Sequence, residues 1–138
     1  MAIVIDASAA LSFLAPSQTT KSSEGFRNGV AATEGLAAPF VFRLEMRHAL
    51  VRLERRLLVS AAALDVELAA FEAVIEIAPA PADGDFARLV SLARIEALGL
   101  YDAAYIDLAL ARGERLASRD AALLGAASRR GVEVHDLR

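Results

Sequence analysis

The stretch Ile3-Val4-Ile5-Asp6-Ala7-Ser8 decides the fold of this chain. Three consecutive branched apolar residues predict a short strand that is buried on both faces of a sheet. A carboxylate follows directly, where it loses hydration and needs a cation or hydrogen-bond donors in return. Because ligands of open α/β sheets bind at the carboxyl ends of the strands, Asp6 is a candidate site residue. Taken alone, Asp6 is better explained as the N-cap of a helix over residues 7–14.

Length and composition predict one folded domain over residues 1–138, because 56% of the 138 residues are hydrophobic. The absence of cysteine excludes a disulfide framework and cysteine-based zinc or redox sites. No signal peptide and no apolar run of ~20 residues are present, so we expect a cytoplasmic protein without membrane contact. The net charge of −3 does not point to a nucleic-acid binder, but charge distribution matters more than the sum.

Strands and helices alternate along the rest of the chain. Further strands are predicted at residues 36–38, 74–78, 115–118 and 132–135. Helices are predicted at residues 21–28 (with an extension to 33), 42–58, 61–72, 82–97, 101–111 and 120–130. Gly99 is predicted to end the helix at residues 82–97. No hairpin is evident, and such alternation is typical of βαβ units around a parallel sheet with helices on both faces.

The helix predicted at residues 42–58 carries two neighbouring stripes. One is apolar and faces the core, and the other is mostly polar. The apolar stripe is Met46, Leu50, Leu53 and Leu57, and the polar stripe is Glu45, Ala49, Arg52 and Arg56. Arg52 and Arg56 are candidates for binding phosphates, with Arg43 and Arg47 nearby, although a solvated or interface face explains them as well. For the next helix the expected inner side is Ala62, Ala63, Val66, Ala69, Ala70 and Ala73.

Four carboxylates stand out by position. Asp6 and Asp120 follow strands, and Glu45 begins a helix that follows a strand, so these three belong to the carboxyl edge of the sheet. Asp102 begins a helix whose placement depends on how the chain crosses the sheet. Each acid has a simpler explanation as an N-cap or as a first-turn partner of the helix dipole.

Together, however, four acids on one rim predict a metal site. Clustered carboxylates repel one another unless a cation neutralises them, and hard oxygen ligands select Mg²⁺ or Mn²⁺. Such ions activate water and stabilise charge on a phosphoryl group. The pattern therefore predicts metal-dependent phosphodiester hydrolysis. Other chemistries find little support, because glycine-rich phosphate loops are absent and Ser8 has no histidine partner in sight. We interpret His48 and His135 as structural.

Four blocks of the sequence resemble a known family. They are Val4 to Leu11 (VIDASAAL), Leu44 to Leu50 (LEMRHAL), Leu98 to Tyr105 (LGLYDAAY) and Leu116 to Asp120 (LASRD). In order and spacing they resemble the PIN domain and, more narrowly, the VapC toxins of type II toxin–antitoxin systems. The resemblance implies a three-layer α/β/α fold with a five-stranded parallel sheet flanked by helices. It also implies an Mg²⁺- or Mn²⁺-dependent endoribonuclease.

The resemblance also implies roles for single residues. Asp6 and Asp102 would be the principal metal ligands, and Glu45 and Asp120 would complete the acidic pocket. The two serines beside the aspartates, Ser8 and Ser118, would orient these carboxylates. A cognate antitoxin would block the pocket, and homodimers are usual in the family.

Two positions depart from the family pattern. His48 stands where many relatives have asparagine, and Ser118 replaces a more common threonine but keeps the hydroxyl.

Three other hypotheses stay open at this point. A phosphoacceptor receiver or a haloacid-dehalogenase-type phosphatase would need a lysine near its aspartates, and the one lysine, Lys21, lies in a polar segment. A PIN nuclease that is not a toxin, or a catalytically silent PIN binding module, would share the same motifs. The sequence names neither the RNA nor the antitoxin.

Overall fold

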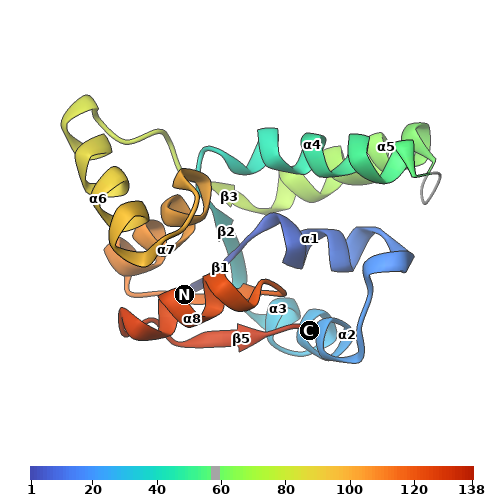
Figure 1. The fold of residues 1–138 in the computed structure, drawn as a ribbon. Coiled ribbons are helices and arrows are strands. Elements are labelled where there is room, and N and C mark those ends of the chain that lie inside the picture. The colour runs from blue at the N-terminus through green and yellow to red at the C-terminus, as the bar shows by residue number, and fades with distance from the viewer. Residues whose placement is uncertain (57–59) are drawn as a thin grey trace.

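The computed structural model describes residues 1–56 and 60–138 (Figure 1). Its strands are β1 (Ala2–Ile5), β2 (Gly35–Ala38), β3 (Glu76–Ile77), β4 (Arg115–Ser118) and β5 (Val134–Asp136). They form a five-stranded sheet in the order β3-β2-β1-β4-β5, and every neighbouring pair is parallel. The predicted parallel sheet is therefore confirmed, with β1 at its centre.

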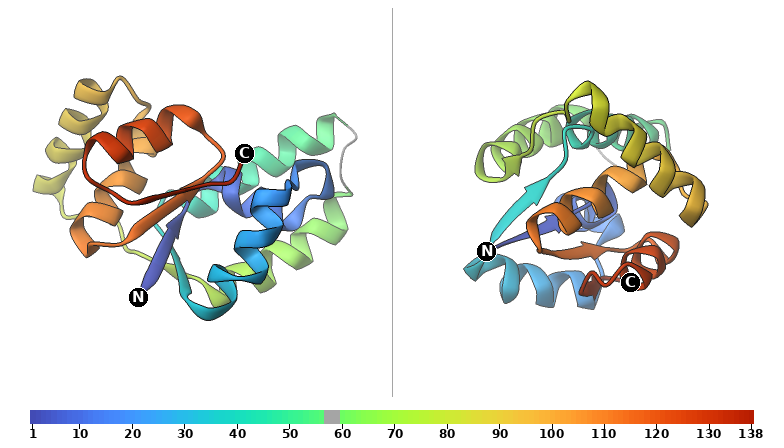
Figure 2. Two further views of the ribbon diagram at one scale, coloured as in Figure 1. Left: turned by 90° about the horizontal axis from the view of Figure 1, so that it is seen from below. Right: turned by 90° about the vertical axis from the view of Figure 1, so that its left-hand side faces the viewer.

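Helices cover both faces of the sheet, which confirms the three-layer arrangement. On one side lie α1 (Ala7–Leu14), α2 (Lys21–Asn28), α4 (Phe42–Arg55) and α5 (Ala61–Val74), and on the other lie α6 (Phe86–Glu96), α7 (Leu100–Arg112) and α8 (Ala121–Arg129) (Figure 2, left). Short turns of helix complete the chain: α3 (Val30–Thr33) and the 3₁₀ segments Pro16–Gln18 and Asp83–Asp85. No helix of the described residues is both long and apolar enough to span a bilayer.

The strand order explains where a site can form. From β1 the chain moves outward to β2 and then β3, whereas from β4 it moves in the opposite direction to β5. The helices that follow β1 and β4 therefore leave toward opposite faces of the sheet, and a crevice opens between them at the carboxyl ends of these two strands. This topological switch point is the usual ligand-binding position in an open α/β sheet.

The core is centred on β1. Ile3, Val4 and Ile5 are completely buried, as expected for a strand that is covered on both faces. Met46, Leu50 and Leu53 of α4 are buried, the first two within this core, which confirms the predicted apolar stripe as far as residue 53. The predicted end of that helix, with Leu57 and Leu58, lies outside the described residues.

The predicted inner face of α5 is wrong. The helix buries Leu64, Leu68 and Glu72, whereas Val66 is 71% exposed and the alanines 62, 63, 69, 70 and 73 also face outward. The larger side chains remove more apolar surface from water, so they, rather than the more numerous alanines, take the inner face.

Several predicted boundaries also shift. Val74 ends α5 and does not begin a strand, so β3 is only two residues long. Gly99 does not end α6: Ala97 takes the left-handed C-cap conformation with φ 53°, and Gly99 is the N-cap of α7. The helix predicted from residue 21 to 33 divides into α2 and α3 at Gly29, and the last strand begins at Val134.

Candidate active site

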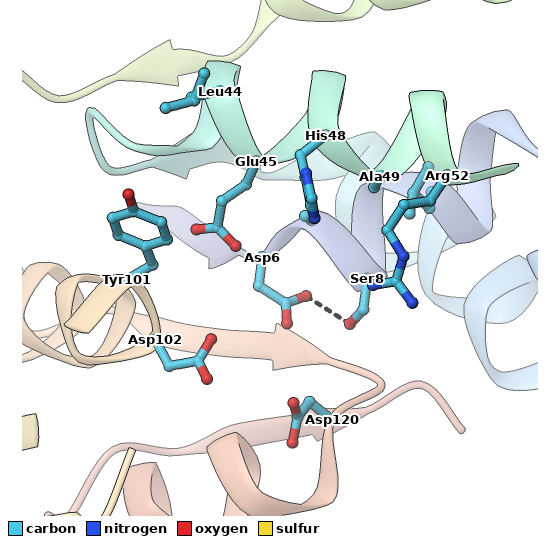
Figure 3. Close-up of a pocket in the computed structure, with 12 residues that line it drawn as sticks. Asp6, Ser8, Leu44, Glu45, His48, Ala49, Arg52, Tyr101, Asp102 and Asp120 are labelled. Atoms are coloured by element: carbon cyan, nitrogen blue, oxygen red, sulfur yellow. Dashed lines mark hydrogen bonds between the residues drawn. The ribbon is translucent and has the colours of Figure 1, made fainter. Parts of the chain in front are cut away.

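A pocket of about 670 Å³ lies at the switch point (Figure 3). Its walls come from the start of α1, one face of α4, the first turn of α7 and the N-cap of α8. The lining residues are Asp6, Ala7, Ser8, Leu11, Leu44, Glu45, His48, Ala49, Arg52, Tyr101, Asp102 and Asp120. The structure thus brings together all four carboxylates that the sequence singled out.

Asp6 is held more tightly than the other acids. Its side chain is only 6% exposed, and Oδ1 accepts hydrogen bonds from Ser8 Oγ at 2.8 Å and from the Ala9 amide at 2.9 Å. Oδ2 accepts a hydrogen bond from Ser118 Oγ at 2.6 Å. A carboxylate offers about four lone-pair positions, so the described contacts leave one of them, on Oδ2, for a ligand. Asp6 is therefore both the N-cap of α1 and a member of the pocket.

The two serines connect β1 to the loop after β4. Ser8 Oγ accepts a hydrogen bond from the Arg119 amide, and Ser118 Oγ accepts one from the Asp120 amide, both at 2.9 Å. Each hydroxyl donates its single proton to Asp6, so the 3.2 Å contact between the two hydroxyls is not a further hydrogen bond. Both hydroxyls thus bind the carboxylate of Asp6, and neither donates a hydrogen bond to the carboxylate of Asp120.

Asp120 divides its two oxygens between two tasks. Oδ1 caps α8 by accepting hydrogen bonds from the Ala122 amide at 2.8 Å and the Leu123 amide at 3.1 Å. No described residue donates a hydrogen bond to Oδ2, and the exposed side chain borders the pocket. The cap and the site are again compatible, because one carboxylate can serve both.

Burial and neighbouring charges raise the pKa of the more buried carboxyl groups of the pocket. Burial raises the pKa of Asp6, and the hydrogen bonds from Ser118, Ala9 and Ser8 only partly oppose this effect. For Asp102, burial raises the pKa first and the negative charges of Asp120 and Asp6 add to it. A cation in the pocket would relieve both effects, since it favours the charged form of each group.

Glu45 has the most perturbed carboxyl group of the pocket. Burial raises its pKa to about 7, with smaller contributions from the charges of Asp102 and Asp6. Its Oε1 atom is buried and makes no hydrogen bond, and the same holds for the Tyr105 hydroxyl. The hydroxyl is near enough to lower the pKa of Glu45 somewhat, although the pair lacks hydrogen-bond geometry. An unpartnered buried oxygen is costly unless a proton or a ligand satisfies it.

The arginines of α4 separate into two groups. Arg52 lines the pocket, one helical turn beyond His48, whereas Arg56 caps the end of α4 and lies outside it. Arg47 instead pairs with the buried Glu72 of α5, with Nη1–Oε1 and Nη2–Oε2 distances of 2.6 and 3.1 Å. Arg43 lies 3.7 Å from the same carboxylate. Arg43 and Arg47 thus hold α4 against α5, which is the interface role that the sequence left open for these arginines.

Two pocket residues were missed by the sequence analysis. His48 lies one turn after Glu45 on the same face of α4 and points into the pocket, and Tyr101 directly precedes Asp102 (Figure 3). The spacing of three residues from Glu45 was a usable signal for His48, since i and i+3 share a helix face. Lys21 begins α2 and does not line the pocket, so the lysine that a phosphoacceptor site needs is missing from the described walls.

A family model confirms the interpretation of the motifs. The model of the PIN domain matches residues 3–128. The chain belongs to the PIN domain family. Since the match begins in β1 and ends in α8, it contains all the acids of the pocket.

Solved structures agree with this fold. PAE2754 from Pyrobaculum aerophilum superposes with a TM-score of 0.73 at 23% identity, over 97% of this chain and 83% of that one. VapBC2 from Rickettsia felis, solved bound to a fragment of promoter DNA, superposes with a TM-score of 0.70 at 13% identity, and both chains are fully covered. FitAcB from Neisseria gonorrhoeae superposes with a TM-score of 0.64 at 19% identity, over 97% of this chain and 96% of that one. No curated protein matches the sequence significantly.

The pocket fits a hard divalent cation in its chemistry, with four carboxylates, raised pKa values and one unpartnered buried oxygen. Among the described residues, however, no three acidic or histidine side chains are arranged to hold an ion together. Mg²⁺ does not require such a cage, because proteins bind it through one or two carboxylates while it keeps several waters or substrate phosphates. The residues of this PIN domain therefore suit a hard divalent cation that keeps part of its water shell better than an ion that demands a complete protein shell.

Proposed function

We propose that this PIN domain is an Mg²⁺- or Mn²⁺-dependent endoribonuclease and the toxin of a toxin–antitoxin pair. The observation that carries the proposal is the convergence of four carboxylates from four separate elements on one pocket at the switch point of the sheet. Helix caps alone do not explain this convergence, because Glu45 and Asp102 cap nothing with their side chains and still face the same pocket.

The roles of the residues follow from their environments. Asp6, rigidly held by two hydroxyls and one amide, and Asp102 would be the principal metal ligands, with Glu45 and Asp120 completing the set. The bound ion would lower the pKa of a coordinated water and stabilise charge on the phosphoryl group. Arg52 would bind a neighbouring phosphate of the RNA, which offsets the repulsion between the acids and the backbone. For Arg56 we propose only a peripheral RNA contact outside the pocket.

The toxin role rests on the structural relatives. VapBC2 and FitAcB share the fold of this chain. By analogy we propose a cognate antitoxin that covers the pocket, a homodimer and a cytoplasmic location. A short reading frame directly upstream, encoding a DNA-binding N-terminus, would support the toxin role, and its absence would favour a PIN nuclease with another task.

Cleavage of single-stranded RNA tests the enzymatic part directly. The wild type should cut a labelled oligonucleotide with Mg²⁺ or Mn²⁺ and lose activity with EDTA. Asp6→Asn and Asp102→Asn should reduce the rate at least about 100-fold, the scale typical of losing one electrostatic contact to the reacting group. The exposed Asp65→Asn is the matched control and should cut normally. Equal cleavage by wild type and Asp6→Asn would overturn the proposal.

One observation favours a silent binding module instead, namely that no three described side chains are arranged for one ion. Calorimetric titration with Mn²⁺ separates the two functions. A nuclease should give a binding heat that Asp102→Ala weakens, whereas the same heat from both proteins would support the silent module.

A further inference from the structure

The two ends of the pocket differ in chemistry. Arg52 lies at one end and the ring of Tyr101 at the other, with the carboxylates of Asp6 and Asp102 between them (Figure 3). Tyr101 is 53% exposed, and Leu44 on the same side of the pocket is 67% exposed. The pocket therefore has a cationic end, an acidic middle and an apolar, aromatic end.

The Tyr101 ring takes no part in the core. All six phenylalanine rings pack against another aromatic ring, whereas no aromatic pair among the described residues includes Tyr101. Tyr105, one turn further along α7, is completely buried, so the helix already has its anchoring aromatic side chain. The exposed ring is thus available to a ligand.

A second hollow makes the ring accessible beyond the main pocket. This hollow has a volume of about 240 Å³ and is lined by Glu45, Gly99, Leu100, Tyr101 and Asp102. Tyr101 borders both hollows, and in each of them Glu45 and Asp102 are its neighbours. A flat group that rests on this ring therefore lies directly beside the carboxylates of the proposed active site.

We propose that Tyr101 stacks against an unpaired base of the RNA next to the cleaved phosphodiester, an inference that rests on the nuclease function proposed above. Proteins hold single-stranded RNA mainly by stacking bases on aromatic side chains. Stacking suits this end of the pocket, because a neutral contact attracts the substrate where nearby carboxylates repel its phosphates. Tyr101 thereby becomes a positioning residue that places the scissile bond over the acids and restricts the enzyme to unpaired RNA.

Binding by variants tests the stacking. We use the full chain with Asp6→Asn to prevent cleavage, and a single-stranded RNA with 2-aminopurine beside the cleavage position. Tyr101→Leu should weaken binding about 5- to 150-fold, the range known for base–aromatic stacking, and should abolish the change in 2-aminopurine fluorescence. Tyr101→Phe should behave as the parent does. Leu110→Ala, 44% exposed at the other end of α7, is the control for surface substitution and should also match the parent.

Turnover with an abasic substrate tests the same contact without the Asp6 change. The wild type should cleave more slowly when the adjacent base is removed, mainly because KM rises. The Tyr101→Leu variant should show no further loss of rate when the same base is removed. Independent, multiplicative losses would overturn the stacking while leaving the nuclease intact. A Tyr101→Leu variant that cuts RNA normally but no longer binds an antitoxin would also overturn it, in favour of protein docking. If the wild type cuts no RNA and binds none, the nuclease proposal fails together with it.

Discussion

Replacing Glu45 by glutamine should stabilise the metal-free protein at neutral and alkaline pH. In the folded state burial raises the pKa of this carboxyl from 4.5 to about 7. The folded protein therefore holds a proton that the unfolded chain has released, and stability falls as the pH rises from about 4.5 to 7. Above about pH 7 the loss of folding stability is complete. Glutamine cannot ionise, so Glu45→Gln removes this loss while keeping the size and most of the polarity of the side chain.

The size of the effect follows from the pKa shift. At about 1.4 kcal/mol per unit, the shift of Glu45 from 4.5 to about 7 corresponds to an upper limit of about 3–4 kcal/mol. Solvent screens part of this energy because the side chain is only partly buried, so we expect about 1–2 kcal/mol. For a domain of this length that energy corresponds to a rise in Tm of about 3–8 °C at pH 8 and almost none at pH 4.5.

Thermal unfolding in EDTA, followed by circular dichroism between pH 4.5 and 8.5, measures the effect. Glu54→Gln is the matched control, because Glu54 is an exposed glutamate of the same helix. Added Mg²⁺ should narrow the gap between Glu45→Gln and wild type, since an ion that binds the folded state raises its stability. If Glu45→Gln melts at or below the wild-type temperature at pH 8, the charged form of Glu45 does not destabilise the folded protein and the reasoning is wrong.

Three further substitutions test separate parts of the structure. Ser118→Ala removes the 2.6 Å hydrogen bond to Asp6, so we expect a loss of about 1–2 kcal/mol in urea unfolding and weaker Mn²⁺ binding by calorimetry. Arg47→Met leaves the buried Glu72 without its main partner and should cost about 1–3 kcal/mol while the rate of RNA cleavage, measured below the melting temperature, stays unchanged. Ala97→Gly should stabilise the protein by about 0.5–1 kcal/mol in urea unfolding, because Ala97 has a φ of 53° that glycine adopts without strain.

The sequence predicted the sheet well because its signals are local. Three buried branched residues, a following acid and regular alternation with helices were enough to identify β1 and the parallel arrangement. The position of Asp102 was not predictable in the same way, because it depends on the crossing from β3 to β4. The fold resolves it: α7 runs back across the sheet before β4, so its first turn lies at the carboxyl edge beside Asp6.

Predictions failed where tertiary contacts outweigh local pattern. The alanines of α5 formed a plausible stripe, but burial of Leu64 and Leu68 removes more apolar surface and turns the helix accordingly. The pairing of Arg47 with Glu72 was not predictable, because the two residues lie 25 positions apart in the chain and no local rule links them. Long-range pairs of this kind become visible only once the helices are placed.

In this fold the same residue can be both a helix cap and a site residue. An N-cap must lie at the end of a strand that leads into a helix, and in a parallel sheet these ends share one edge with the ligand crevice. Asp6 and Asp120 therefore cap α1 and α8 with Oδ1, and each keeps acceptor capacity on Oδ2 for the pocket. The capping bonds fix the carboxylates on rigid elements, which is the preorganisation that a catalytic site needs. Replacing either aspartate should thus reduce helix stability and activity together, whereas Asp102→Asn, which breaks no cap, should reduce activity without destabilising the fold.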